Sequence, residues 1–374
     1  MHKVLVSILF VIMLLVQPSL AGDNCQSKLL QSDTLVMLQN DQVLVTFSLW
    51  GGALIDFHFH DQGTNPFTWR LSCEEMPLNN RGGAPFQGHF ICLGRWGSPS
   101  LGEIRCGIPH NGEPANRWWK LTNRHGQHEV HLSVEAPLEQ FILQRSIRLS
   151  PDQSWFGVTE KLINQQNSGR LIVLMQHATF GAPFLSESVV IDCNATHGFN
   201  QSLILIDPDN YHYRWPMGLA DTLGTPMDLR RSDGQIGYVS THIIEEDYGW
   251  ATAANPKMNL LVGYVWKRSD YPWLHIWHGL KDGRLWAKGI EFGTTGLGDT
   301  FSPEDRLRHQ FHGVTHFEFL DAQAAVEKKY LCFLLKIPAD FQQVRSVSLS
   351  DNFLQVDYSA ARQSYTAKLT VESF

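Results

Sequence analysis

The stretch HEVHLSVEAPLEQFILQRSIRL, residues 128–149, alternates apolar and polar side chains through two consecutive runs, 128–136 and 141–149. A period of two places every second side chain on the same face, which is typical of a β-strand with one face buried. We therefore expect a strand in each run, with Val, Leu, Ile and Phe facing a core and Glu, Gln and Arg facing solvent.

The same alternation recurs along most of the chain. It appears in short runs that are rich in β-branched and aromatic residues and are separated by Gly, Pro, Asn, Asp or Ser, among them TLVMLQ, QVLVTFSL, ALIDFHFH, WFGVTEKLI, RLIVLMQ, LLVGYVW and SVSLSDNFLQVDYS. Helical periodicity is scarce, and the one fair helix candidate, residues 321–335, also contains strand-like residues. The sequence predicts an all-β fold, a large antiparallel β-sandwich. No Ser- or Gly-rich linker divides the chain, so we expect one domain over residues 22–374.

Composition narrows the range of partners. The chain has 374 residues, of which 43% are hydrophobic, and its formal net charge is −7. This supports a substantial core. Without a long basic run, an acidic chain is a poor match for nucleic acid or for an anionic membrane surface.

The N-terminus has the pattern of a cleaved secretory signal over residues 1–21. A short basic start is followed by an apolar run over 4–16 and by the small-residue ending Ser19-Leu20-Ala21. The apolar run is too short for a comfortable membrane span. We expect a secreted or periplasmic protein with no membrane attachment after cleavage.

Six cysteines follow the expected cleavage site, and an exported chain can form disulfides. Cys92 and Cys106 flank a motif-rich loop and could be bridged, although free buried cysteines are an equal alternative.

Three segments depart from the alternation: residues 79–119, 174–200 and 273–305. Each is rich in Gly, Trp, His and polar residues. Loops of such composition often carry binding or catalytic residues. We expect the three segments to meet on one concave face.

Four motifs occur in these segments in a fixed order: the pair Gly94-Arg95, the loop from Pro109 to Trp119, His177 ahead of Phe180-Gly181, and Glu291 within GIEFGTTG. This order resembles the aldose 1-epimerase, or galactose mutarotase-like, superfamily, and in particular a branch that carries EFGTTG. The resemblance implies a supersandwich fold and a carbohydrate partner, either a free aldose or an oligosaccharide.

The chain departs from the family pattern at several positions. The family's His-Gly reads Asn111-Gly112, with His110 displaced by one, so either His110 or Asn111 could contact substrate. The arginine expected before the late glutamate reads Lys288. A second active-site aspartate has two weak candidates, Asp221 and Asp228.

The residue types suit the chemistry that the resemblance implies. Opening a pyranose requires a base at the anomeric hydroxyl and an acid at the ring oxygen, and a carboxylate and an imidazole can fill these roles. We expect Glu291 as the base and His177 as the acid, flanking the sugar from opposite sides. Arg95, His110 or Asn111, and Lys288 would hold hydroxyls. The reaction requires no cofactor and no metal.

Two other function classes stay open. One is a non-catalytic carbohydrate-binding protein, and the other is a glycoside hydrolase or lyase. A second carboxylate within about 10 Å of Glu291 across the pocket would favour hydrolysis. Four tryptophans of the motif-bearing segments are expected in the core rather than against a sugar: Trp118, Trp119, Trp273 and Trp277. The pairs His58/His60 and His275/His278 show no third ligand, so no metal site is expected there.

Overall fold

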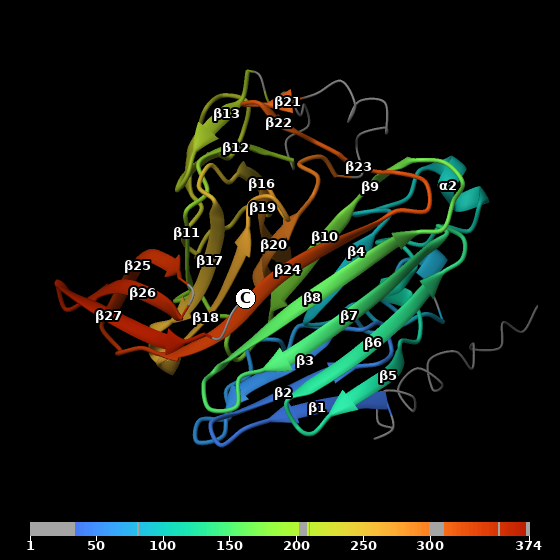
Figure 1. The fold of residues 1–374 in the computed structure, drawn as a ribbon. Coiled ribbons are helices and arrows are strands. Elements are labelled where there is room, and N and C mark those ends of the chain that lie inside the picture. Colours follow the sequence, from blue (N-terminus) through green and yellow to red (C-terminus); the bar gives the residue numbers. More distant parts are fainter. Residues whose placement is uncertain are drawn as a thin grey trace, which may run out of the picture.

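Two large antiparallel β-sheets face each other and form the body of the protein (Figure 1). The computed structural model describes residues 34–80, 82–201, 208, 210–298, 310–350 and 352–371. In spatial order the ten-stranded sheet contains β1 (Leu35–Gln39), β2 (Val43–Ser48), β3 (Leu54–Phe59), β4 (His89–Leu93), β10 (Leu174–Phe180), β20 (Arg284–Gly293), β19 (Trp273–Lys281), β16 (Tyr238–Ile243), β12 (His197–Asn200) and β13 (His212–Arg214). The eight-stranded sheet contains β11 (Val190–Cys193), β17 (Tyr248–Asn255), β18 (Leu260–Lys267), β24 (Ala325–Lys336), β8 (Trp155–Asn164), β7 (Phe141–Leu149), β6 (Glu129–Ala136) and β5 (Lys120–His125).

The remaining elements are small. A three-stranded sheet contains β25 (Phe341–Leu349), β26 (Phe353–Ala360) and β27 (Gln363–Thr370). Three two-stranded pairs join β14 (Met217–Leu219) to β15 (Pro226–Asp228), β21 (Gln310–Phe311) to β22 (Val314–Thr315), and β9 (Arg170–Ile172) to β23 (Glu318–Leu320). Helical structure in the described residues comprises α2 (Leu101–Arg105) and the 3₁₀ turns η2 (Leu78–Asn80), η3 (Pro114–Asn116) and η4 (Pro256–Met258). The expected all-β antiparallel sandwich is confirmed.

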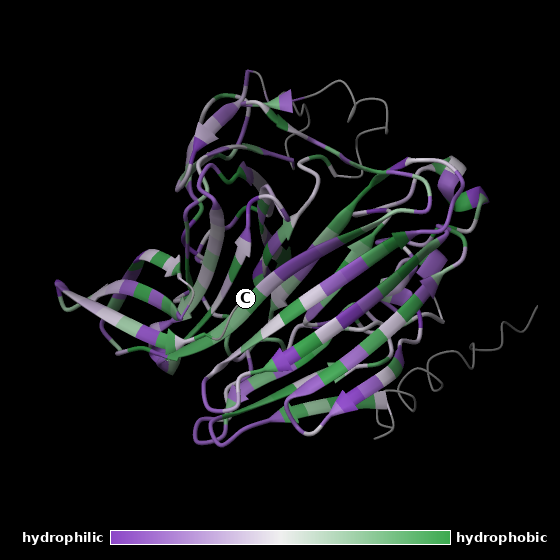
Figure 2. Cartoon of the chain, viewed as in Figure 1, coloured by the Kyte–Doolittle hydropathy of each residue, from purple (hydrophilic) through white to green (hydrophobic). Residues whose placement is uncertain are grey.

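The alternation in the sequence builds the core between the two large sheets. On β7, Phe141, Leu143, Ile147 and Leu149 are fully buried and belong to the inter-sheet core. Figure 2 shows the same alternation of hydrophobic and hydrophilic residues along β6, β7 and β8. The fair helix candidate is instead mostly strand β24, because it lies between β18 and β8 and buries side chains on both faces.

The two faces of the ten-stranded sheet have different surroundings: one packs in the core between the sheets, and the other lies away from that core. From β10, Leu174, Ala178 and Phe180 point into the core between the sheets. Met175 belongs to a separate aromatic-rich cluster on the opposite face, together with Phe90 of β4. Side chains at odd-numbered positions of β10 therefore leave the core, and His177 is one of them.

The three-stranded sheet covers part of the outer face of the eight-stranded sheet, beside β17 and β18 (Figure 1). Its Val344, Leu354 and Val356 pack with Leu261 and Phe333 in a second hydrophobic cluster. A local third layer therefore closes this side of the sandwich.

Most of the described cysteines are free thiols, which is the second of the two alternatives that the sequence left open. Cys92, Cys106, Cys193 and Cys332 are free, so the suggested bridge between Cys92 and Cys106 is wrong. Cys92 is sealed inside strand β4, whereas Cys106 is exposed after α2. Cys73 is disulfide-bonded.

The expected signal peptide, residues 1–21, lies outside the described residues. Within the part of the chain that the structure describes, no helix is long and apolar enough to cross a membrane.

Candidate functional site

A cavity of about 500 Å³ opens on the face of the ten-stranded sheet that lies away from the core. Its lining draws on all three motif-bearing segments, as expected, and on residues before and between them: Trp69, Leu71, Glu75, Pro77, Phe86, Phe90, Trp96, Gly97, His110, Asn111, His177, Gln201, Val239, Trp277, Trp286, Glu291 and Gly298. Much of the third segment forms strands β19 and β20 rather than loops. The sequence of this segment does not show the usual alternation of apolar and charged residues. Its cavity-facing positions carry His, Trp and Gly, whereas the solvent-facing positions of an ordinary strand carry charged residues.

His177 and Glu291 lie side by side on the cavity floor. They are direct partners in the antiparallel pairing of β10 with β20, so their side chains leave the sheet on the same face. His177 Nε2 is 3.3 Å from Glu291 Oε1. The two groups therefore touch each other, and the expectation that they flank a sugar from opposite sides is wrong. Cross-strand partners stand too close together to leave room for a ring between them.

Glu291 is a buried carboxyl group whose contacts within the described part of the chain are an indole and an imidazole. It is 1% exposed, and its Oε2 accepts a hydrogen bond from Trp96 Nε1 at 3.0 Å. Burial raises the pKa of Glu291 to about 8, and the hydrogen bond from Trp96 only partly offsets that rise. The carboxyl group is therefore mainly protonated near neutral pH.

His177 is held in place by stacking and by one hydroxyl. Its Nδ1 lies 2.9 Å from Thr179 Oγ1, and its ring stacks on Phe90 with centroids 4.3 Å apart. The edge of Trp277 packs against the same imidazole. Burial lowers the pKa of His177 to about 3, so the imidazole is neutral. The pair thus carries one transferable proton on the carboxyl group and one unprotonated ring nitrogen.

His275 completes a row across the sheet floor. It is the partner of Glu291 on β19, as His177 is on β10. Its Nδ1 lies 2.8 Å from Thr241 Oγ1 and its Nε2 lies 3.1 Å from the Thr295 carbonyl oxygen. The ring packs against Trp96 at 4.3 Å between centroids. His275 therefore packs against Trp96 and does not belong to the described cavity lining.

The first loop brings both of its candidate residues to the cavity. Asn111 has φ 61° and Gly112 has φ 79°, and Asn and Gly are the residues that best tolerate this left-handed backbone. Asn111 Oδ1 accepts a hydrogen bond from the Gly97 backbone at 2.8 Å and so braces the segment after β4 that carries Trp96. His110 lines the cavity with its Nδ1 3.3 Å from Ser98 Oγ.

Lys288 and Arg95 do not belong to the described cavity lining. Lys288 lies three residues before Glu291 on one strand, and this odd spacing puts it on the opposite face of the sheet. Its Nζ donates to Tyr238 Oη at 2.8 Å and to the Arg231 carbonyl oxygen at 3.1 Å. Arg95 is buried and donates from Nε to the Ser98 carbonyl oxygen at 2.7 Å. Neither side chain lines the described cavity, and the expectation that Lys288 and Arg95 contact substrate stays an untested prediction.

Among the described lining residues the acidic ones are Glu291 and Glu75, and neither Asp221 nor Asp228 belongs to them. Asp221 accepts hydrogen bonds within its own exposed turn, and Asp228 caps the backbone of Arg230. Glu75 lines the cavity instead. It forms an ion pair and hydrogen bond with Lys281, which lowers the pKa of Glu75 to about 2. No sequence motif pointed to Glu75.

Aromatic side chains make up much of the cavity wall. Trp69 meets Trp277 at 5.6 Å and Trp286 at 5.2 Å between ring centroids, in edge-to-face arrangements. Trp277 was expected in the core and instead lines the cavity. The other three expected core tryptophans lie outside the lining: Trp119 and Trp273 are buried, and Trp118 is exposed and stacks on Trp50.

Comparison with known proteins finds similar structures but no similar sequence family or curated protein. No family model and no curated protein sequence matches the chain. Among solved structures, a galactose mutarotase related enzyme from Lactobacillus acidophilus has a TM-score of 0.59 and 12% identity, over 81% of this chain and 98% of that one. A galactose mutarotase-like protein from Clostridium acetobutylicum has a TM-score of 0.58 and 15% identity, over 81% and 95%.

A protein from Klebsiella pneumoniae that is provisionally assigned as an aldose 1-epimerase gives a TM-score of 0.56 at 15% identity, over 80% of this chain and 78% of that one. At such low identity, these similarities define the fold. The chain shares the β-sandwich fold of these galactose mutarotase-like structures, and His177 and Glu291 are paired on the floor of its aromatic-walled cavity.

Proposed function

We propose that this protein is an exported, single-domain carbohydrate-active enzyme that interconverts the anomers of a free aldose. Glu291 and His177 act together as the acid and base. The observation that carries the proposal is their contact at 3.3 Å on the cavity floor, with both groups held uncharged.

The contact suits the geometry of the reaction. The anomeric hydroxyl oxygen and the ring oxygen are both bonded to C1, so one carbon separates the two sites of proton transfer. An acid and a base that touch each other can reach both oxygens from one side of the sugar. Two groups across a pyranose are therefore unnecessary, and the adjacent arrangement is sufficient.

The directions of the two pKa shifts support the following order of proton transfers. Protonated Glu291 donates its proton to the ring oxygen, while His177 Nε2 accepts the proton of the anomeric hydroxyl as the C1–O5 bond breaks. This leaves a carboxylate and an imidazolium beside an open-chain aldehyde. After rotation about C1–C2, His177 returns its proton to the aldehyde oxygen and Glu291 recovers its proton from the C5 hydroxyl. Ring closure on the other face of C1 then gives the second anomer and the original enzyme. The starting roles are the reverse of those expected from the sequence.

The cavity walls support a sugar ligand. Trp69, Trp277 and Trp286 present large flat rings, and His110 and Gln201 offer polar contacts along the same lining. A mainly apolar pocket with few convergent polar groups is the usual form of a small-molecule site.

Export is supported by two observations. Residues 1–21 have the pattern of a secretory signal, and Cys73 is disulfide-bonded. Disulfides persist mainly in oxidising compartments. Both observations support the proposal that the enzyme acts outside the cytosol, either secreted or in a periplasm.

Glycoside hydrolysis is a second candidate, favoured by the presence of Glu75 in the same cavity. Hydrolases use one carboxyl group with a raised pKa as the acid and a second, ionised carboxylate. Glu291 and Glu75 have pKa values shifted in those opposite directions. Glu75, however, is already neutralised by Lys281, whereas Glu291 contacts an imidazole directly. This arrangement favours anomer exchange.

Polarimetry with freshly dissolved α-glucose, α-galactose and α-xylose tests the proposal. The protein should accelerate the change in optical rotation above the spontaneous rate for at least one sugar. His177→Asn and Glu291→Gln should each reduce kcat/KM about 10²–10⁴-fold, since positioned acid–base groups typically contribute that much. The matched controls His60→Asn and Glu327→Gln, outside the described cavity lining, should retain wild-type rates.

Failure to accelerate any aldose would reject the enzyme proposal. Release of free sugar from aryl glycosides or oligosaccharides, with loss on Glu75→Gln, would establish hydrolysis instead. Binding of oligosaccharides without either activity would leave a carbohydrate-binding protein.

A further inference from the structure

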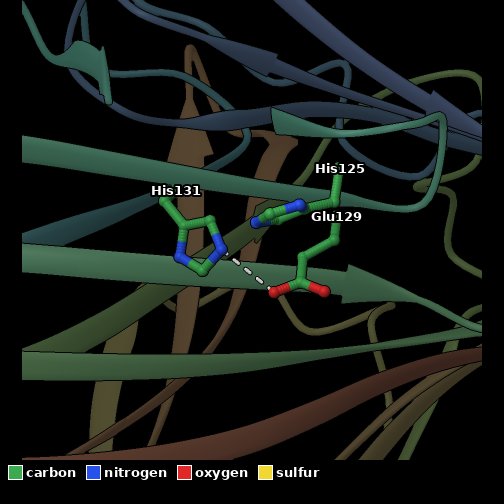
Figure 3. A group of neighbouring side chains, drawn as sticks. All are labelled: His125, Glu129 and His131. Carbon is green, nitrogen blue, oxygen red and sulfur yellow. Dashed lines mark ion pairs between the residues drawn. The ribbon is translucent and has the colours of Figure 1, made fainter. Parts of the chain in front are cut away.

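Three side chains with metal-ligating atoms converge at the end of the β5–β6 hairpin, outside the cavity: His125, Glu129 and His131 (Figure 3). One ligand atom from each lies within 4.8 Å of the other two. His131 Nε2 and Glu129 Oε1 are already 3.0 Å apart, the contact drawn as a dashed line in Figure 3. Two imidazoles and one carboxylate thus share a small volume at the surface.

The hairpin register explains why these residues meet. His125 ends β5, Glu129 begins β6, and the two are direct partners in the antiparallel pairing. His131 lies two residues after Glu129 on the same strand, so its side chain leaves on the same face. Gly126, with φ 61°, allows the chain to reverse between the two strands. The convergence therefore follows from the strand geometry.

Strand β6 is anchored to the core beneath Glu129 and His131. On β6, the intervening Val130 and the next core residue Leu132 are 0% and 1% exposed and pack into the inter-sheet core. Glu129 and His131 consequently point outward from a fixed strand. Ligands on well-packed strands lose little freedom when they bind an ion.

The neighbouring groups are compatible with a cation. Asn123 pairs with His131 and lies with its side-chain amide 3.0 Å from His125 Nε2, so a second polar group orients that ring. Arg148 is the partner of Glu129 on β7 and is the positive group nearest in the register.

We propose that His125, Glu129 and His131 form a surface binding site for a divalent transition-metal ion of the Zn²⁺ class. Imidazole nitrogen with one carboxylate oxygen suits Zn²⁺, Ni²⁺ and Cu²⁺, whereas Ca²⁺ and Mg²⁺ require mostly oxygen ligands. Three protein ligands leave a fourth tetrahedral position open to water at this exposed location. A bound ion cross-links β5 to β6.

The cross-link has a structural consequence. Strand β5 is the terminal strand of the eight-stranded sheet, and all six of its residues are exposed. Terminal strands are the parts of a sheet that fray or pair with other chains most readily. An ion that binds only the folded hairpin stabilises it by an amount that grows with the logarithm of the ion concentration once that concentration exceeds Kd.

Isothermal titration with ZnCl₂ tests the site, using the full purified protein without a histidine tag. We expect one ion per chain and an increase in Tm with added Zn²⁺. His125→Ala and His131→Ala should each weaken binding at least about tenfold, since loss of even an outer-shell partner commonly costs 10–100-fold. His128→Ala, in the same hairpin but outside the group, is the matched control and should bind like wild type. CaCl₂ in place of ZnCl₂ should produce no heat of binding.

Tm values of all variants in EDTA serve as the folding check and should agree within experimental error. Equal Zn²⁺ binding by wild type and the His125→Ala/His131→Ala double variant would overturn the proposal. Loss of binding in His177→Asn alone would also overturn it, by moving the ion to the cavity. Wild-type protein that takes up no Zn²⁺ would overturn it as well.

Discussion

Glu160 and Glu291 are both buried carboxyl groups, and they lie on opposite sides of the ten-stranded sheet. Glu160, 0% exposed, faces the core between the sheets, where Arg145 Nη2 contacts its Oε1 at 2.7 Å. Gln176 donates to its other oxygen at 2.6 Å. Glu291, 1% exposed, receives one bond from an indole and faces the neutral imidazole of His177.

The difference separates a structural carboxylate from a reactive one. Arg145 compensates the charge of Glu160, so that group serves packing and connects the two sheets. Glu291 has no such compensation from the described residues, and its raised pKa keeps a proton available beside the cavity. Strand β10 supplies the partner in both cases, Gln176 to one face and His177 to the other.

Removing a partner should have the largest effect in the core. Arg145→Met leaves Glu160 buried without its cation and should cost about 3–5 kcal/mol of unfolding free energy. Glu291→Gln should change stability little at pH 6, because the wild-type group is already uncharged there. Urea denaturation of both variants checks the contrast. The double variant Arg145→Met/Glu160→Gln should recover part of the lost free energy of unfolding. Equal losses of unfolding free energy in Arg145→Met and Glu291→Gln would contradict the distinction between the two carboxyl groups.

Lys288 lies on the face of the ten-stranded sheet opposite the cavity, and its replacement should cause a loss of stability of intermediate size. Lys288→Met leaves the carbonyl oxygen of Arg231 and the hydroxyl of Tyr238 without their donor, which should cost about 1–3 kcal/mol. Anomer exchange should be unaffected, since the ammonium group points away from the cavity. A large loss of kcat/KM in a variant that remains folded would place Lys288 in the reaction after all.

The pH dependence of stability should differ in sign between the paired residues. Folded Glu291 keeps its proton up to a pKa of about 8, so this group destabilises the protein as pH rises from its ordinary value of 4.5. Folded His177 lacks its proton down to a pKa of about 3, so stability rises with pH until its ordinary value of 6.5. Each slope is at most about 1.4 kcal/mol per pH unit.

Chemical denaturation between pH 4.5 and 8.5 measures these slopes. Glu291→Gln should gain stability relative to wild type as pH rises towards 8. His177→Asn should lose stability relative to wild type as pH rises towards 6.5. Parallel curves for the two variants would show that neither group has the assigned proton occupancy.

The smallest expected effect is a shift in a pH–rate profile. kcat/KM should fall above about pH 8, where the pair loses its shared proton. Trp96→Phe removes the indole donor that lowers the pKa of Glu291, so the high-pH limb should move to higher pH. A limb that stays in place would show that another group controls it.

The sequence predicted the sandwich because alternation is a local property that each strand displays by itself. It also predicted that His177 and Glu291 belong together, through the order of the family motifs. The odd spacing of Lys288 from Glu291 on a predicted strand was a local signal that the two side chains lie on opposite faces.

Other features depend on tertiary pairing and had no local signal. His275 matters because β19 pairs with β20 in a register that sets it opposite Glu291. Glu75 and Trp69 come from a stretch without strand pattern or motif and reach the cavity through the path of the loop. The metal-binding hairpin was missed for the same reason, since His125 and Glu129 become neighbours only when the hairpin closes.

A double-mutant comparison of anomer exchange tests the central claim most directly. His177→Asn, Glu291→Gln and their combination are compared with wild type by polarimetry on the best aldose. If the two residues act as one proton-exchanging unit, the double variant should have a kcat/KM close to that of the more damaged single variant. If the two losses multiply instead, the residues act independently, and the paired mechanism on the cavity floor is wrong.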